Sequence, residues 1–383
     1  MATICNVRIF DGTAFRKESA VTFENGTVTA LDDRREGEDM GGVLLCPGFV
    51  DIHMHGQKGL DSMRPGDNGR MAETQVKYGV TSFCPASITE TDEAIRAYLA
   101  DIRAAMELER GARVLGAYLE GPYLAERVKG AHNAAKLRDP ELTHYKALTA
   151  GFEDEIRRVT LAPEKPGGME LVQYLKGRGV VASIGHSVAT AAEASRAVAL
   201  GITCSTHTCN GMEPLHHRKP GVLGVTLTDD GIRAEFIADL VHIDPILIRL
   251  IYRAKGVEGC YFCTDSMEAA GMPDGNYHLC SGQTGVQRSL SRTTQKRNKY
   301  ERIILSFDGI VRLSDGLVNC KTESPNRRSG AGTTSWGAGA VFGQGTQKGH
   351  RTPKSSEKVY VTSILPCSKT RICSTASAMV ARS

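Results

Sequence analysis

The sequence predicts an α/β fold, a (β/α)8 barrel of the TIM type that follows a small β domain. Between about residues 47 and 280, short apolar runs alternate with helical stretches, a pattern typical of a parallel sheet with crossover helices. Several apolar runs end in a polar residue that could carry chemistry, as in VLGAYLEG and CYFCTD. Because the carboxyl ends of parallel barrel strands meet on one face, these residues are expected to face a common site.

The first 46 residues predict the small β domain. They contain two β-like pieces, TICNVRIF and SAVTFENGTVTAL, with turn signals at DG and NG. The start does not resemble a signal peptide, and no apolar run approaches the roughly 18 residues that cross a bilayer. The 11 cysteines lack a spaced framework. We therefore expect a cytoplasmic protein with reduced thiols and no membrane partner.

The first predicted barrel strand, PGFVDIHMHG, carries His53 and His55. Residues i and i+2 of a strand share a face, so both imidazoles point the same way, about 7 Å apart at roughly 3.3 Å per residue. The pair could be two metal ligands or two core histidines with satisfied hydrogen bonds. The residues of the other predicted strands are needed to choose between these two interpretations.

The later strands also end in polar residues. One such residue can simply meet water, but a whole succession of them is poorly explained in that way. Helical segments such as TAAEASRAVAL lie between the strands, and Gly201 is expected to stop that helix. The strand-end residues are Glu120, Glu164, His186, His207 with Asn210, His242 and Asp265.

Imidazole and carboxylate groups in this pattern suit a divalent metal, with Zn²⁺ or Fe²⁺ expected. A metal-dependent hydrolase needs a water molecule that a metal activates and a nearby carboxylate that takes its proton. Asp265 is the candidate for that base. One or two ions are expected, and the candidate ligands are His53, His55, Glu120, His186 and His207.

These residues lie in motifs that resemble the N-acetylglucosamine-6-phosphate deacetylases of the amidohydrolase superfamily. The resemblance covers about residues 1–280 and rests on PGFVDIHMHG, LEGPYL with KGAHN, SIGHS, STHTCNGMEPLHHRKPG and TDSMEAAG. It implies hydrolysis of the N-acetyl group of N-acetylglucosamine 6-phosphate to glucosamine 6-phosphate and acetate, in amino-sugar catabolism. It also implies a homodimer.

The resemblance further implies individual roles. Glu120, His186 and His207 match the principal metal ligands, while His53 and His55 match the pair found in members with a second metal. Asp265 matches the general acid and base, and His132 matches a histidine that polarises the acetamide carbonyl. Arg218 matches an arginine that reaches the sugar phosphate of the neighbouring subunit. Substrate contacts are implied for Ala131, Asn210, Gly211 and His242.

Two alternatives stay open at this point. The chain could be another amidohydrolase that acts on a different amide, although KGAHN and HHRKPG speak against it. It could also be an inactive or unstable product with an incomplete C-terminal part. The sequence does not separate the gluco epimer of the substrate from the galacto epimer.

Residues 281–383 depart from the family pattern, except for an island at 308–318, DGIVRLSDGLV. This region holds 17 Lys and Arg against 5 Asp and Glu and has little apolar periodicity. It could be a basic tail that binds nucleic acid, a genuine extension, or sequence translated out of frame. The island favours the last, so no nucleic-acid partner is expected. We expect 281–307 and 319–383 to form loops, with the C-terminal complement of the small β domain missing.

Overall fold

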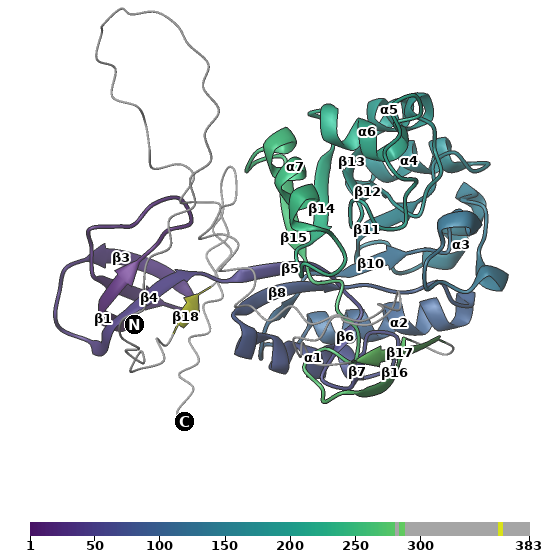
Figure 1. The fold of residues 1–383 in the computed structure, drawn as a ribbon. Coiled ribbons are helices and arrows are strands. Elements are labelled where there is room, and N and C mark those ends of the chain that lie inside the picture. Colours follow the sequence, from purple (N-terminus) through teal and green to yellow (C-terminus); the bar gives the residue numbers. More distant parts are fainter. Residues whose placement is uncertain (280–282, 288–358, 363–383) are drawn as a thin grey trace, which may run out of the picture.

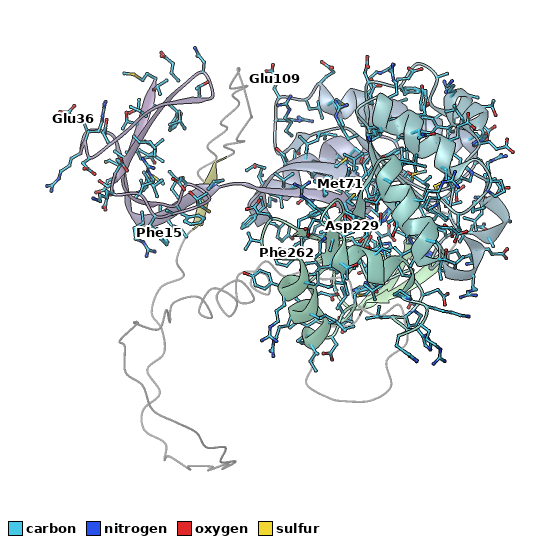
Figure 2. The ribbon with its side chains drawn as sticks, turned by 90° about the horizontal axis from the view of Figure 1, so that it is seen from above. Phe15, Glu36, Met71, Glu109, Asp229 and Phe262 are labelled. Carbon is cyan, nitrogen blue, oxygen red and sulfur yellow. The ribbon has the colours of Figure 1, made fainter. Side chains whose placement is uncertain are left out.

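The structure is a computed structural model that describes residues 1–279, 283–287 and 359–362 (Figure 1). A small sheet domain and a larger barrel domain lie side by side in Figure 1. Figure 2 shows Phe15 and Glu36 on the small domain and Met71 within the barrel domain. Met71 is fully buried, whereas Phe15 is 66% exposed.

The small domain is a sheet whose strands come mostly from the first 47 residues, as the sequence predicts. β1 pairs with β2 antiparallel and with β4 parallel, and β2 pairs with β3 antiparallel. Asn25 and Gly26 form the tight turn between β2 and β3, both with positive φ, which the NG signal predicts. The strands are β1 (Ala2–Ile9), β2 (Ala20–Glu24), β3 (Thr27–Asp32), β4 (Glu38–Pro47) and β18 (Val359–Thr362).

Eight parallel strands form the predicted barrel. They are β5 (Phe49–Met54), β8 (Val80–Pro85), β10 (Ala117–Glu120), β11 (Ile156–Leu161), β12 (Val181–Ile184), β13 (Ile202–Ser205), β14 (Arg233–Ile237) and β15 (Cys260–Cys263). β5 and β8 belong to one sheet with the short β9 (Arg113–Val114), and β10 to β15 form a second. Parallel bridges between Ala86 and Tyr118 and between Met54 and Ser266 join the two sheets at both seams. The barrel therefore closes, and the predicted fold class is confirmed.

Helices between the strands form the outer layer. Their ends follow local rules: Thr190 and Glu193 make a reciprocal capping box at the start of α5, and Gly201 caps its end, as predicted. The α-helices are α1 (Asp67–Gln75), α2 (Asp92–Met106), α3 (Leu142–Thr149), α4 (Gly168–Gly177), α5 (Ala191–Leu200), α6 (Gly221–Thr228) and α7 (Pro245–Lys255). Short 3₁₀ helices are η1 (Val76–Tyr78), η2 (Glu126–Val128) and η3 (Ala134–Lys136). No helix in the described part of the chain is long and apolar enough to cross a membrane.

Two short strands contradict the expectation of loops after residue 280. β17 (Gln283–Gln287) pairs antiparallel with β16 (Gly275–Leu279), and β18 pairs parallel with β4. β18 therefore gives the small domain a C-terminal strand, contrary to the expectation that this complement is missing. Both segments pair through their backbones, and such pairing requires no family motif in the sequence. The island at 308–318 and the rest of 281–383 lie outside the described residues.

Candidate active site

The predicted metal ligands lie at the carboxyl ends of the barrel strands. His53 and His55 belong to β5 and its end, and Glu120 is the last residue of β10. His186, His207 and Asp265 each lie two residues beyond their strands, β12, β13 and β15. These three residues have positive φ angles of 47°, 28° and 47°. A non-glycine residue in this region costs about 1–3 kcal/mol, and such residues gather at functional sites.

Glu120 lies at the centre of four imidazoles. Its Oε1 is 3.2 Å from Nε2 of His186 and 3.0 Å from Nε2 of His207. Its Oε2 is 2.9 Å from Nε2 of His55 and 3.4 Å from Nε2 of His53. The structure thus brings one imidazole nitrogen of each of the four candidate histidines within 3.4 Å of a carboxylate oxygen of Glu120.

Asp265 lies beside the pair of histidines on the first strand. Its Oδ1 is 3.2 Å from Nε2 of His53 and 3.3 Å from Nε2 of His55. Donor atoms of His53, His55, Glu120 and Asp265 lie within 4.8 Å of one another. Asp265 can therefore act as a proton acceptor at this end of the site or share an ion with the two histidines.

The donor atoms fit a cation. Nδ1 of His186 is 2.8 Å from the carbonyl of Val128, and Nδ1 of His207 is 3.1 Å from the carbonyl of Asn210. Because a carbonyl only accepts, each neutral ring carries its proton on Nδ1 and a lone pair on Nε2. The two Nε2 atoms are only 3.0 Å apart and both face Glu120. Lone pairs packed against a carboxylate repel one another, and a divalent ion between them would turn this repulsion into coordination.

The electrostatics around the two histidines of the first strand also favour a cation at this site. Burial disfavours their charged forms, but Asp265 and Glu120 outweigh it and raise the pKa of His55 to about 9. Burial likewise opposes a carboxylate at position 120, yet the charge of the neighbouring His53 holds the pKa of Glu120 well below its usual range. Nε2 of His53 is buried and has no hydrogen-bond partner among the described residues. The site therefore favours positive charge at its centre.

His132 has the opposite tautomer. Its Nδ1 accepts a hydrogen bond from the backbone N–H of Thr89 at 3.2 Å. The neutral ring therefore carries its proton on Nε2, which faces Oε2 of Glu120 at 3.8 Å. Burial and the neighbouring His186 lower the pKa of His132 well below its ordinary value. His132 thus presents a neutral N–H donor beside the cluster.

The predicted substrate contacts lie around the cluster. Ala131 adjoins His132 in the loop after η2. Nδ2 of Asn210 is buried without a partner in the described part of the chain. Gly211 has φ +59°, and a Cβ there would lie 2.8 Å from Nδ1 of His186. Nδ1 of His242 bonds Oδ2 of Asp239 at 2.7 Å.

Arg218 does not lie in the cluster. It occupies the exposed loop between β13 and α6, where its Nη1 is 2.7 Å from Nε2 of His217. Its side chain is exposed to solvent rather than directed into the barrel.

Sequence reasoning missed three buried or half-buried charges. Glu235 and Arg158, inside β14 and β11, form an ion pair in the barrel interior. Glu164 is expected only to end a strand, yet its Oε2 accepts from Ser187 Oγ and its Oε1 from the N–H of Val188, both at 2.7 Å. It thereby holds the loop that carries His186. A charge within an apolar strand requires a buried partner, which was the available signal.

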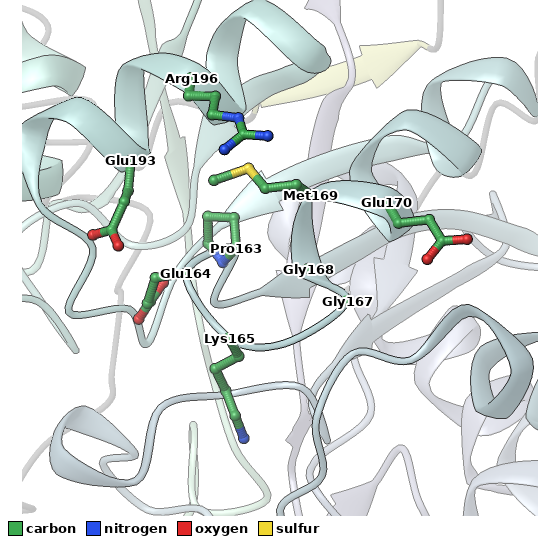
Figure 3. Close-up of a pocket in the computed structure, with 9 residues that line it drawn as sticks. All are labelled: Pro163, Glu164, Lys165, Gly167, Gly168, Met169, Glu170, Glu193 and Arg196. Atoms are coloured by element: carbon green, nitrogen blue, oxygen red, sulfur yellow. The ribbon is translucent and has the colours of Figure 1, made fainter.

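Two hollows lie away from this cluster. One, of about 390 Å³, lies beside α4 and α5, and Figure 3 shows Glu164, Lys165 and Arg196 around it. Another, of about 560 Å³, opens near the amino ends of the strands and includes Arg158 and Tyr261. Neither lining contains a cluster ligand, so cavity size alone does not locate the chemistry; the convergence of donor atoms does.

A parallel barrel with imidazole and carboxylate donors at its carboxyl end defines the class of metal-dependent hydrolases. The model of the amidohydrolase family matches residues 44–317, and the chain belongs to this family. It is 34% identical over 328 residues to an N-acetylglucosamine-6-phosphate deacetylase of Lysinibacillus sphaericus, covering 84% of each chain. It is 38% identical over 274 residues to an N-acetylgalactosamine-6-phosphate deacetylase of Escherichia coli, covering 70% of this chain and 71% of the other.

The fold agrees with a solved structure. The crystal structure of an N-acetylglucosamine-6-phosphate deacetylase from Thermotoga maritima superimposes with a TM-score of 0.65 at 33% identity. The match covers 72% of this chain and 74% of the other. The family resemblance inferred from the motifs is thereby confirmed.

Proposed function

We propose that the chain hydrolyses the N-acetyl group of N-acetylglucosamine 6-phosphate to give glucosamine 6-phosphate and acetate. The observation that carries this proposal is the convergence of Glu120, His186 and His207, with His132 and Asp265 beside them, at the carboxyl end of the barrel. The names of the relatives support it over an amidohydrolase that acts on a different amide.

Glu120, His186 and His207 would hold the principal divalent ion, and His53 with His55 would hold a second. A bound Zn²⁺ or Fe²⁺ would supply Lewis acidity and lower the pKa of a water molecule. Nitrogen and oxygen donors of this kind suit either ion. The Nδ1 bonds of His186 and His207 leave a lone pair on each Nε2, which supports these two atoms as the proposed ligands.

Asp265 would move the proton. Its carboxylate accepts a proton from the attacking water and returns it to the departing sugar amine. The left-handed backbone at this position points the side chain across the cluster toward His53 and His55. Its side chain is 19% exposed, more than any of the candidate ligands, so it can meet both water and substrate.

His132 would stabilise the developing negative charge on the acetamide oxygen. Its Nε2–H is the free donor because Thr89 occupies Nδ1. A preorganised donor in a buried site is worth more than one in water. The neutral ring is suited to this task, since it donates without having to lose a charge.

The sugar phosphate would be held by Arg218 of a second copy of the chain. A guanidinium offers a planar fork that matches phosphate oxygens, and Arg218 points outward on an exposed loop. We therefore propose a homodimer in which each subunit completes the site of the other. A cytoplasmic location is proposed separately, from the unpatterned cysteines of the sequence. Ala131, Asn210, Gly211 and His242 would contact the sugar.

The galacto epimer is a second candidate substrate, because one relative at 38% identity is named for it. The test is acetate release by the purified chain, loaded with Zn²⁺ or Fe²⁺, from both phosphorylated sugars and from unphosphorylated N-acetylglucosamine. We expect turnover of a phosphorylated sugar and little of the unphosphorylated one. A metal-loaded, folded chain that releases no acetate from any of them would refute the proposal.

A further inference from the structure

A buried ion pair lies beneath the candidate metal cluster. Glu235 in β14 is fully buried, and the side chain of Arg158 in β11 is 4% exposed. Nη1 of Arg158 donates to Oε2 of Glu235 in a close contact. Nη2 of the same guanidinium donates to Ser183 Oγ at 2.9 Å and to Thr206 Oγ1 at 3.2 Å. The guanidinium also lies over the ring of Tyr118, 4.4 Å from its centre. One oxygen of Glu235 is therefore firmly anchored.

The other oxygen of Glu235 reaches two candidate ligands. Oε1 is 2.9 Å from Nδ1 of His53 and 3.0 Å from the backbone N–H of His207. His53 belongs to the side of the cluster that holds His55 and Asp265, whereas His207 belongs to the side that holds Glu120 and His186. A single carboxylate oxygen thus contacts both halves of the cluster.

The contact with His53 selects the atom that can bind a metal. A carboxylate paired with arginine only accepts hydrogen bonds, so the neutral ring carries its proton on Nδ1. Nε2 then presents its lone pair 3.2 Å from Oδ1 of Asp265. Without Glu235 the ring could change tautomer or rotate, and Nε2 would no longer be held toward the centre.

The contact with His207 stabilises an unfavourable backbone conformation at that residue. His207 has φ +28°, a conformation that a non-glycine residue adopts only when its surroundings hold it there. The hydrogen bond from its N–H to Glu235 is one such restraint. It keeps Nε2 of His207 3.0 Å from Oε1 of Glu120.

We propose that Glu235 is a positioning residue that sets the donor geometry of both His53 and His207, and that Arg158 anchors it from below. The inference rests on the proposed function, because it takes these histidines to bind metal. Its test is metal affinity, measured as Zn²⁺ retained per chain during dialysis against graded concentrations of a chelator. The thermal unfolding midpoint of each metal-free protein is measured alongside.

Three variants separate positioning from mere stability. Glu235→Gln keeps the shape but loses the charge, and we expect Zn²⁺ affinity to fall about 10–100-fold, the usual effect of losing such a partner. Arg158→Met combined with Glu235→Gln removes both buried charges, so the unfolding midpoint should return toward that of the wild type. Its Zn²⁺ affinity should stay low. Glu155→Gln breaks the Arg103–Glu155 pair, 2.6 Å long and near the start of β11, and should leave affinity unchanged.

The outcomes are distinguishable. If the wild type retains Zn²⁺ and Glu235→Gln retains it equally well, the inference fails while the proposed function stands. If the double variant recovers Zn²⁺ affinity together with stability, the pair is only structural and the inference again fails. A wild-type chain that binds no divalent metal would overturn the proposed function and this inference together. Lowered affinity in both Glu235 variants, with stability restored in the double variant, supports the positioning role.

Discussion

Replacing Asp265 by asparagine tests the proposed proton transfer most directly. Asparagine has the same shape and, like aspartate, tolerates the left-handed backbone found here at φ 47°. The backbone N–H of residue 265 donates to the carbonyl of His53 at 2.9 Å, and this bond does not depend on the side chain. The substitution should therefore leave the fold intact and remove only the ability to accept a proton.

The size of the effect follows from the neighbouring groups. Losing a general base costs about 10²–10⁴-fold in rate, or about 2.7–5.5 kcal/mol of activation free energy. The two other carboxylates described at the site have other partners, Glu120 as a proposed metal ligand and Glu235 as the partner of Arg158 and His53. Because neither is free to replace Asp265, we expect a loss toward the upper end of this range.

The assay compares kcat for acetate release at saturating substrate with the metal content of the same sample. Asp265 is not among the proposed ligands of the principal ion, which are Glu120, His186 and His207. At least this ion should therefore remain bound in the variant. Asp244→Asn is the matched control, because Asp244 caps α7 through a bond to the N–H of Ile246, and asparagine caps equally well. A fully metal-loaded Asp265→Asn enzyme with kcat within a few-fold of the wild type would place the base elsewhere.

Three further results are expected. Arg218→Ala should raise KM for the phosphorylated sugar far more than for an unphosphorylated analogue, since only the former needs the guanidinium; equal losses in steady-state kinetics would make Arg218 structural. Chelation should lower the thermal unfolding midpoint, and added Zn²⁺ should restore it. When free metal exceeds its Kd 100-fold, binding should raise the free energy of unfolding by about 2.7 kcal/mol. A midpoint that responds to neither treatment would argue against the metal centre. Thr190→Ala should cost about 1 kcal/mol in urea unfolding by removing the capping box with Glu193, without changing kcat; no loss of stability would show that the cap is dispensable.

Much of the barrel and its site could be predicted from the sequence, because the residues able to bind a metal or transfer a proton lie at the ends of apolar strands. Glu120, His186, His207 and Asp265 each follow a short apolar run, and parallel topology alone brings such ends together. The alternation of β5 likewise places His53 and His55 on one side. The roles assigned to these residues rest on the family resemblance, whereas their proximity follows from the fold.

What the sequence could not reveal depends on contacts between distant strands. Glu235 and Arg158 lie inside runs that look like ordinary strands, 77 positions apart. Nothing local indicates that one pairs with the other or that Glu235 supports His53. The same holds for β17 and β18, because their pairing depends on the position of β16 and β4 as much as on their own residues.

The seam at which the barrel closes runs through the candidate site. The bridge from Met54 to Ser266 joins the first and eighth strands, and Thr264 Oγ1 donates to Asp51 Oδ2 across 213 positions of the chain. Contacts with such long sequence separation close a large loop and are expected to form late in folding. His53 lies on one side of this seam and Asp265 on the other. A metal bound across this seam would slow the unfolding of the barrel. It would leave the folding rate largely unchanged, because its contacts form late.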